Sequence, residues 1–389
     1  MLLAPAFPER RRFSQEAGNR MTLSTVSRRA ALLGLVFCAL ACDVVAFASD
    51  PKPILEQTWN LPASSTAISV GKILPSTVSI YSTPGSNPPD SSAFLLNINN
   101  VVFPRRVGND CAQCQTLNGT TAVKPAFILT AGSSSALGTD VLSGAMLGAT
   151  VTYSIVNNLT FDPIRVRALS DPNQGYLIIL MHSGSLVLGR DSVNGTTTAF
   201  PAGSTLTRAI SLTTGTVVGS IAVDLTVNSP QGDHNEFINA NGTLNTTAVI
   251  TNMRTGNVRV NVINKTVTNK PDTLDLKGLD KTITNHVVGA ALEMGFTNPW
   301  SVAGNLNVNF AYAPPQSIPK SVLLPAANSP LTSQVETVTL SGDEMKLLFG
   351  NEVLLDMNGV VNSPTPVTVT PKQAVSISNR LVLTIRTGS

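Results

Sequence analysis

The sequence predicts an all-β protein, built as tandem β-sandwich domains behind a cleaved signal peptide. Apolar and polar residues alternate with a period of two, which is typical of half-buried strands, over residues 221–227, 258–262, 306–310 and 375–385. The 389 residues are 42% hydrophobic and 13% charged, whereas soluble domains average about 25% charged residues. A chain with this many apolar residues can bury enough apolar surface to fold, which argues against intrinsic disorder.

The first element is an export signal over residues 21–48. The basic pair Arg28-Arg29 precedes an apolar run, residues 30–41. That run is too short to span a hydrocarbon core of about 30 Å and has the length of a signal-peptide core. We expect Met21 to be the true start and residues 1–20 to be an over-called extension. The basic pair is compatible with export by the general secretion route or by the twin-arginine route.

Two processing sites compete at the end of the leader. Residues 46–48 (Ala-Phe-Ala) suit cleavage before Ser49. Residues 39–42 (Ala-Leu-Ala-Cys) resemble a bacterial lipoprotein signal, in which Cys42 becomes lipidated and anchors the protein to a membrane. Either site predicts a location outside the cytoplasm, in the bacterial envelope or periplasm, or secreted.

The charge of the chain also belongs to the leader. Residues 1–48 carry six Arg and three acidic residues. Because the whole sequence has 26 basic and 23 acidic residues, 20 of each follow residue 48, and the exported part is neutral. Nucleic-acid binding needs clustered Lys and Arg, so we expect no nucleic-acid partner.

The remaining chain divides into three predicted regions. Residues 49–145 form an N-terminal β-rich region, and residues 146–270 and 286–389 each form a β-sandwich, with 271–285 as a linker. Paired landmarks suggest that the second sandwich repeats the first: Asn158-Leu159-Thr160-Phe161 with Phe200-Pro201, and Asn298-Pro299-Trp300 with Leu324-Pro325.

Two kinds of local signal refine the elements. Ser341 followed by Glu344 three residues later is a capping box, which predicts a short helix. Asn-Gly pairs tolerate positive φ and are therefore hairpin-turn candidates; they occur at Asn118-Gly119, Asn194-Gly195, Asn241-Gly242 and Asn358-Gly359.

The same landmarks carry a family resemblance. An Asn-Pro element with an aromatic residue, followed by a Pro-Ala stretch that enters another strand, resembles the late-embryogenesis-abundant group 2, or water-stress-hypersensitivity, module. The second copy has Asn298-Pro299-Trp300, whereas the first has Asn158-Leu159 in place of Asn-Pro. The resemblance implies a non-catalytic, Ig-like sandwich.

Cys111-Ala112-Gln113-Cys114 is the main chemical motif. An exported protein meets an oxidising compartment, where a structural disulfide in a loop is favoured. A thioredoxin-like redox pair requires a helix that starts at the motif, and the neighbouring residues suggest a loop. Half of a zinc site would require a second Cys or His pair. We expect the disulfide Cys111–Cys114, and neither a metal site nor a cofactor.

Other catalytic or ligand groups are isolated. The histidines, His182, His234 and His286, have no paired spacing. His182 comes at the end of an apolar run. This position suggests a histidine at a strand end rather than a general base. Residues 233–236 (Asp-His-Asn-Glu) offer oxygen ligands without the EF-hand spacing, so we interpret them as a solvated hairpin loop rather than a calcium site.

These patterns predict a non-catalytic exported envelope protein with a structural or adhesive role, not an enzyme. One alternative is a binding module for a lipid or another hydrophobic ligand, because the chain is apolar and poor in charge. The other is an envelope thiol-disulfide protein that uses Cys111 and Cys114. Expected partners are the membrane, through lipidated Cys42, and an envelope protein or hydrophobic ligand.

Overall fold

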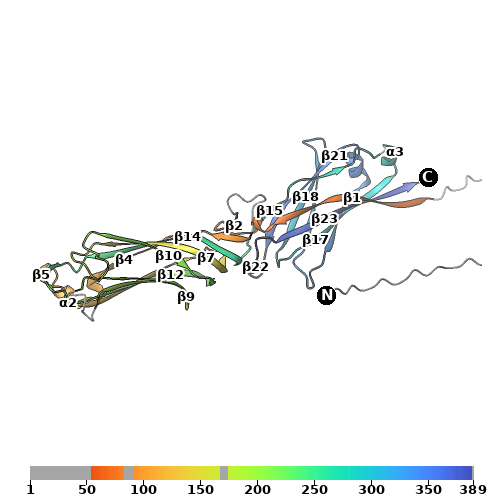
Figure 1. Cartoon of the computed structure of the whole chain (residues 1–389). Helices are drawn as coiled ribbons and strands as arrows, with labels where there is room; N and C mark the ends of the chain where they lie inside the picture. The colour runs from red at the N-terminus through yellow and green to blue at the C-terminus, as the bar shows by residue number, and fades with distance from the viewer. Residues whose placement is uncertain (1–53, 83–91, 167–173, 280, 388–389) are drawn as a thin grey trace, which may run out of the picture. The chain divides into compact units, whose positions relative to one another are not determined.

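The computed structural model describes residues 54–82, 92–166, 174–279 and 281–387. Antiparallel sheets dominate these ranges (Figure 1), so the predicted all-β class is confirmed. The helices are short: α2 (Ala112–Thr116), α3 (Lys281–Thr284) and α4 (Gly342–Leu348), with 3-10 turns at Val70–Lys72 and Val107–Asn109. Within the described ranges, none of the helices combines the length and hydropathy of a membrane span.

The first sandwich consists of two main sheets (Figure 1). One sheet contains β10 (Thr205–Leu212), β11 (Gly215–Val218), β7 (Val141–Asn157), β14 (Thr243–Val260), β4 (Val101–Arg106), β3 (Ala93–Leu96) and β2 (Val78–Tyr81). The other contains β6 (Phe127–Ala136), β12 (Ser220–Ser229), β8 (Tyr176–Ser183) and β9 (Leu186–Asn194). A small sheet pairs β5 (Thr120–Val123) with β13 (Asn235–Ile238).

The apolar faces of the two main sheets form the core of this sandwich. Alternate residues of β7 and β12 are buried, in agreement with the predicted period of two. Tyr153 of β7 donates a hydrogen bond from its hydroxyl to Asp191 of β9 at 2.7 Å, and Asp191 also pairs with Arg208. This polar bridge links the two sheets.

The second sandwich also has two sheets. One contains β1 (Leu55–Ser69), β23 (Ala374–Thr387), β17 (Val287–Thr297) and β20 (Gln334–Ser341). The other contains β15 (Lys265–Thr268), β16 (Asp272–Asp275), β21 (Glu352–Asn362), β18 (Ala303–Ala311) and β19 (Ser317–Leu324). The short strand β22 (Val367–Val369) pairs with the end of β14 and so connects the second sandwich to the first.

Both sandwiches have the same strand order. In the first, the order is β4-β14-β7-β10 in one sheet and β6-β12-β8-β9 in the other. In the second, it is β1-β23-β17-β20 and β16-β21-β18-β19. Each of these strands therefore has a counterpart at the same place in the other sandwich, with β1 at the position of β4.

The strand pairing divides residues 55–145 differently from the sequence-based expectation of one N-terminal region over 49–145. β1 pairs with β23, the last strand of the chain, while the strands from β2 to β6 belong to the first sandwich. The first sandwich is thus inserted between two strands of the second. Residues 271–285, expected to be a linker, include β16, which pairs with β21. Alternation identifies a strand but does not specify its partner.

A buried asparagine closes the corner at the end of β7. The Asn157 amide nitrogen donates to the backbone oxygens of Phe161 at 3.1 Å and Phe200 at 2.7 Å. Its side-chain oxygen accepts from the Leu159 backbone N–H at 3.0 Å. One fully buried side chain therefore satisfies three backbone groups where the chain leaves the sheet.

The same corner follows β17. The Asn298 amide nitrogen donates to the backbone oxygens of Val302 and Pro325, both at 2.8 Å, and its oxygen accepts from the Trp300 N–H at 3.0 Å. The counterpart of Asn298 is therefore Asn157, one residue before the Asn158 that the sequence landmarks pair with it.

Two local predictions have different outcomes. The capping box of α4 is present, because Ser341 accepts from the Glu344 N–H and Glu344 accepts from the Ser341 N–H. Asn358-Gly359 lies inside β21 rather than in a hairpin turn. A Cβ on Gly359 would lie 2.2 Å from a backbone oxygen of β18, so the glycine permits close strand approach. The tight β8–β9 hairpin instead uses Gly184, at a φ of 58°.

Replacing Asn157 by Ala should lower the free energy of unfolding by about 3 kcal/mol, since three buried backbone groups lose their partner at about 1 kcal/mol each. Chemical denaturation monitored by circular dichroism measures this change. The matched control is Asn158→Ala, because the neighbouring side chain is exposed and should change stability by less than about 0.5 kcal/mol. Equal effects of the two variants would contradict a structural role for the corner.

Candidate functional site

The predicted cysteine pair is buried at the start of α2. The two sulfur atoms lie at disulfide-bonding distance, 1.99 Å apart. Cys111 is the N-cap of α2, and its sulfur accepts a hydrogen bond from the Cys114 N–H at 3.0 Å. The expectation of a loop at this motif is therefore wrong: residues 112–116 are helical, because the cysteine cap satisfies an N–H of the first turn.

An ion pair holds the segment that leads into this helix. The Arg105 guanidinium donates to both carboxylate oxygens of Asp110, at 2.7 and 2.6 Å. The Asp110 carboxylate raises the pKa of Arg105. Since Cys111 and Cys114 are nearly inaccessible to solvent, the surroundings of the pair are those of a structural link.

The predicted lipidation site, Cys42, lies outside the described residues, as does the rest of the leader.

A buried lysine forms a second polar centre, which sequence reasoning missed. Lys124 is 1% exposed. Its ammonium donates to Ser229 Oγ at 2.9 Å and to the backbone oxygens of Asp162 and Pro163, both at 3.3 Å. Three donated hydrogen bonds use all three N–H bonds of the ammonium. Lys124 is therefore a tether between β12 and the 162–163 segment.

Burial lowers the pKa of Lys124 to about 8, and the carboxylates of Glu236, Asp162 and Asp233 oppose this shift. Two of these carboxylates also contact His234: Asp233 at 2.6 Å and Glu236 at 3.2 Å. Among the described residues, no three His, Cys, Asp or Glu side chains are grouped as a metal site would require. The charged side chains of residues 233–236 therefore pair with one another.

His182 lies near the end of β8, as the apolar run before it suggested. Its ring nitrogens contact the Gly184 backbone oxygen at 2.8 Å and Asp224 at 2.9 Å. The hydrogen bond to Gly184, followed by that to Asp224, raises the pKa of His182. Both nitrogens are engaged in holding the β8–β9 turn next to β12.

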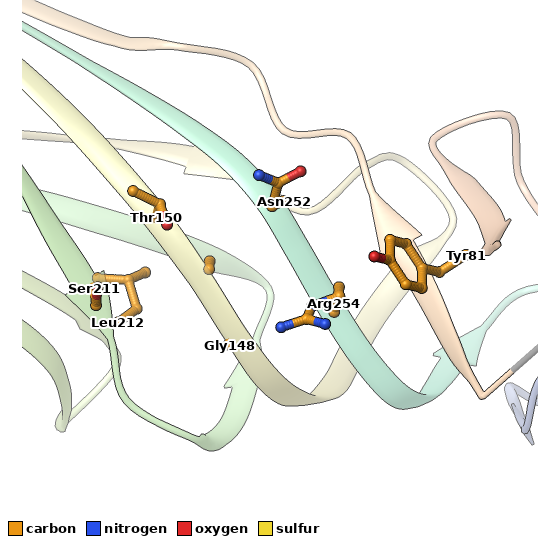
Figure 2. A pocket seen from close by; sticks show the side chains of 8 residues that line it. Tyr81, Gly148, Thr150, Ser211, Leu212, Asn252 and Arg254 are labelled. Carbon is orange, nitrogen blue, oxygen red and sulfur yellow. The ribbon is translucent and has the colours of Figure 1, made fainter. Parts of the chain in front are cut away.

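A polar hollow lies on the first sandwich, and we call it the Arg254 pocket (Figure 2). It has a volume of about 470 Å³. Strands β2, β7, β10 and β14 contribute its lining, namely Tyr81, Gly148, Ala149, Thr150, Ser211, Leu212, Asn252 and Arg254. Thr150 lies on the face of β7 opposite to the buried Tyr153, so the pocket opens on the outer face of the sheet.

Arg254 is the charged group of this pocket. Figure 2 shows its guanidinium between Gly148 and the Tyr81 ring. The carbon of the guanidinium lies 5.5 Å from the centre of that ring, a cation–π distance. Within the part of the chain that the structure describes, no carboxylate pairs with Arg254. Among the described residues, the pocket therefore presents a positive charge that no carboxylate neutralises.

A second hollow, of about 480 Å³, lies on the second sandwich. Its lining is uncharged and rich in amides: Thr266, Gly304, Asn305, Asn307, Asn358, Gly359, Val360 and Asn362. It offers hydrogen bonds without a charge or an aromatic ring.

Comparisons with known proteins add no function. No family model matches the sequence, and no curated protein matches it. Among solved structures, the chain is similar to one described as a "putative secreted protein" from Parabacteroides distasonis ATCC 8503. The sequence identity is 10% and the TM-score 0.30, over 84% of this chain and 99% of the other. The function must be argued from the residues of this chain.

The lowered pKa of Lys124 predicts a pH-dependent stability. In the unfolded chain this lysine keeps its proton up to its ordinary pKa of 10.5, whereas in the folded protein it loses the proton near pH 8. Between these pH values the unfolded state binds more protons, so the free energy of unfolding rises with pH. Relative to a Lys124→Met variant, the wild type should gain at most about 3 kcal/mol across this range.

Urea denaturation at pH 7 to 11 measures the difference between the two proteins. An exposed lysine, Lys372, provides the control variant Lys372→Met, which should follow the wild type. A constant difference between wild type and Lys124→Met at every pH would show that the buried ammonium does not titrate as proposed.

Proposed function

We propose that this chain is a non-catalytic, exported envelope protein with a structural or adhesive role, anchored by lipidated Cys42 or released by cleavage before Ser49. The observation that carries the proposal is the leader, residues 21–48, which lies six residues before the first strand of an all-β fold. A basic pair followed by a short apolar core has the form of a signal peptide.

The strand pairing supports a display role for the first sandwich. Leu55 pairs with Thr387, so β1 begins and β23 finishes at the same end of one sheet. Ser69, at the other end of β1, leads into the first sandwich. At about 3.3 Å per residue, Ser69 lies roughly 45 Å along β1 from Leu55. An anchor at Cys42 would thus be joined through β1 to the second sandwich, before the chain enters the first.

The use of reactive side chains supports a non-catalytic role. The cysteine pair closes the first turn of α2, the ammonium of Lys124 is fully committed to hydrogen bonds, and His182 is held at both ring nitrogens. Each group stabilises local structure, whereas a nucleophile or general base needs access to a substrate.

The two alternatives have weaker support. A lipid-binding module needs an apolar cavity, whereas the Arg254 pocket is lined mainly by polar side chains. A mass spectrum of lipids extracted from the purified protein would reveal such a ligand. A thiol-disulfide protein needs an accessible sulfur, and Cys111 and Cys114 are buried.

A Cys42→Ser variant should move the protein from the membrane fraction to the soluble fraction, because a serine cannot be lipidated. Attachment of the producing cells to surfaces should fall to the level of a deletion strain. Detergent phase partitioning and the intact mass of the mature N-terminus measure the first effect, and a cell-attachment assay measures the second.

The matched control is Cys38→Ser, since Cys38 lies in the same apolar run but outside the lipoprotein-like residues 39–42. It should leave anchoring unchanged. If the mature N-terminus is Ser49 in the wild type, the protein is released rather than anchored. If residues 21–48 remain on the protein in the cytoplasm, the proposed export fails.

Replacing both Cys111 and Cys114 by Ser should lower the free energy of unfolding by about 2 kcal/mol, the loop-closure value for so short a loop. Cell attachment should be unchanged at temperatures where the variant remains folded. Thermal unfolding and the attachment assay measure the two effects. Loss of attachment by a folded double variant would instead favour the thiol-disulfide alternative.

A further inference from the structure

The Arg254 pocket exists because β14 carries an extra residue opposite β7. Thr251 pairs with Thr150 and Arg254 pairs with Gly148, so three steps along β14 match two along β7. Asn252, inside this bulge, has a left-handed φ of 53°, a conformation that asparagine tolerates better than most residues. Bulges change the direction of side chains, and this one brings Asn252 and Arg254 to the same hollow.

Gly148 keeps the space in front of Arg254 open. A Cβ built on Gly148 would have no atom within 4 Å, so the missing side chain leaves room rather than relieving a clash. The neighbouring lining groups, Thr150 and Ser211, add hydroxyls at the side of the pocket away from Tyr81 (Figure 2). A ligand that enters there meets a cation, an amide and two hydroxyls.

The cation–π contact with Tyr81 positions the guanidinium for an anion. An aromatic ring contacts the flat face of a guanidinium, and the N–H groups in the plane stay available as donors. Those N–H groups match the two oxygens of a carboxylate. Because this contact with Tyr81 restrains Arg254, less side-chain entropy is lost when a carboxylate binds.

The rest of the lining selects among carboxylates. Hydroxyl and amide groups of Thr150, Ser211 and Asn252 can exchange hydrogen bonds with a polyol. A single arginine suits one negative charge, and about 470 Å³ is within the range of small-molecule pockets. We propose that the Arg254 pocket binds the carboxylate-bearing sugar of an acidic polysaccharide. This inference rests on the proposed adhesive function, whose ligand class it names.

The test is a calorimetric titration of residues 49–389 with a trimer of α-1,4-linked galacturonic acid, and with the neutral glucose trimer of the same linkage. The acidic trimer should bind at least tenfold more tightly than the neutral one, and its affinity should fall as salt is raised, because the contact with Arg254 is ionic. Equal affinity for both trimers, or no binding of the acidic trimer, would overturn the proposal.

Variants locate the binding. Arg254→Gln should lower the affinity for the acidic trimer at least tenfold. Arg259→Gln, which removes an exposed arginine of the same strand, should leave that affinity unchanged. Asn252→Asp keeps a residue that tolerates a left-handed φ but adds a negative charge, and it should abolish binding. Melting temperatures establish that each variant is folded. Binding that survives in Arg254→Gln would place the ligand elsewhere, for example in the amide-lined hollow, and refute the proposal.

Two further arms separate the explanations. A trimer of aspartic acid should bind at least tenfold more weakly than the galacturonic acid trimer, and equal affinity would mean that the pocket recognises carboxylates of peptides, not sugar acids. The attachment assay with Cys42→Ser tests the adhesive function independently. If purified protein binds the acidic trimer through Arg254 but cells lacking the protein attach normally, the site stands and the adhesive function fails.

Discussion

A buried asparagine at the end of a central strand is the interaction on which both sandwiches depend. Asn157 and Asn298 each satisfy two backbone oxygens and one backbone N–H at the point where the chain leaves one sheet for the other. Burying those groups unpaired would cost about 1–3 kcal/mol each. An aspartate would lack the donor, and a leucine would satisfy none of them. The corner therefore requires an amide. The two sandwiches share both this corner and the order of their strands.

The insertion of one sandwich into the other follows from β1. This strand occupies the sheet edge in the second sandwich that β4 occupies in the first, yet it is separated from its partner β23 by most of the chain. Closing such a long loop has a high entropic cost, which grows only slowly with length. The pairing over residues 55–69 offsets that cost, and β22 adds a second connection by pairing with β14.

Sequence reasoning found what is encoded locally. Alternation along β12 and β23 revealed strands because one face of each is buried, and Ser341 with Glu344 revealed α4 because a capping box is contained in four residues. It failed where the cause lies elsewhere in the chain. Nothing near Leu55 indicates Thr387 as its partner, and Gly359 is required by the backbone of β18 rather than by a turn. The Arg254 pocket was invisible for the same reason, because four strands contribute to it.

Regular sheet surfaces also explain why a binding site would arise at a bulge. An undistorted strand presents alternate side chains at a fixed spacing, which gives a flat surface with little concavity. The extra residue in β14 breaks this regularity, and Gly148 removes the side chain that would otherwise fill the opening. Residues 49–389 carry 20 basic and 20 acidic residues. Long-range attraction of anions to this part of the chain is therefore weak. Recognition of an acidic ligand must therefore come from short-range contacts, and an arginine in cation–π contact with Tyr81 is well suited to supply them.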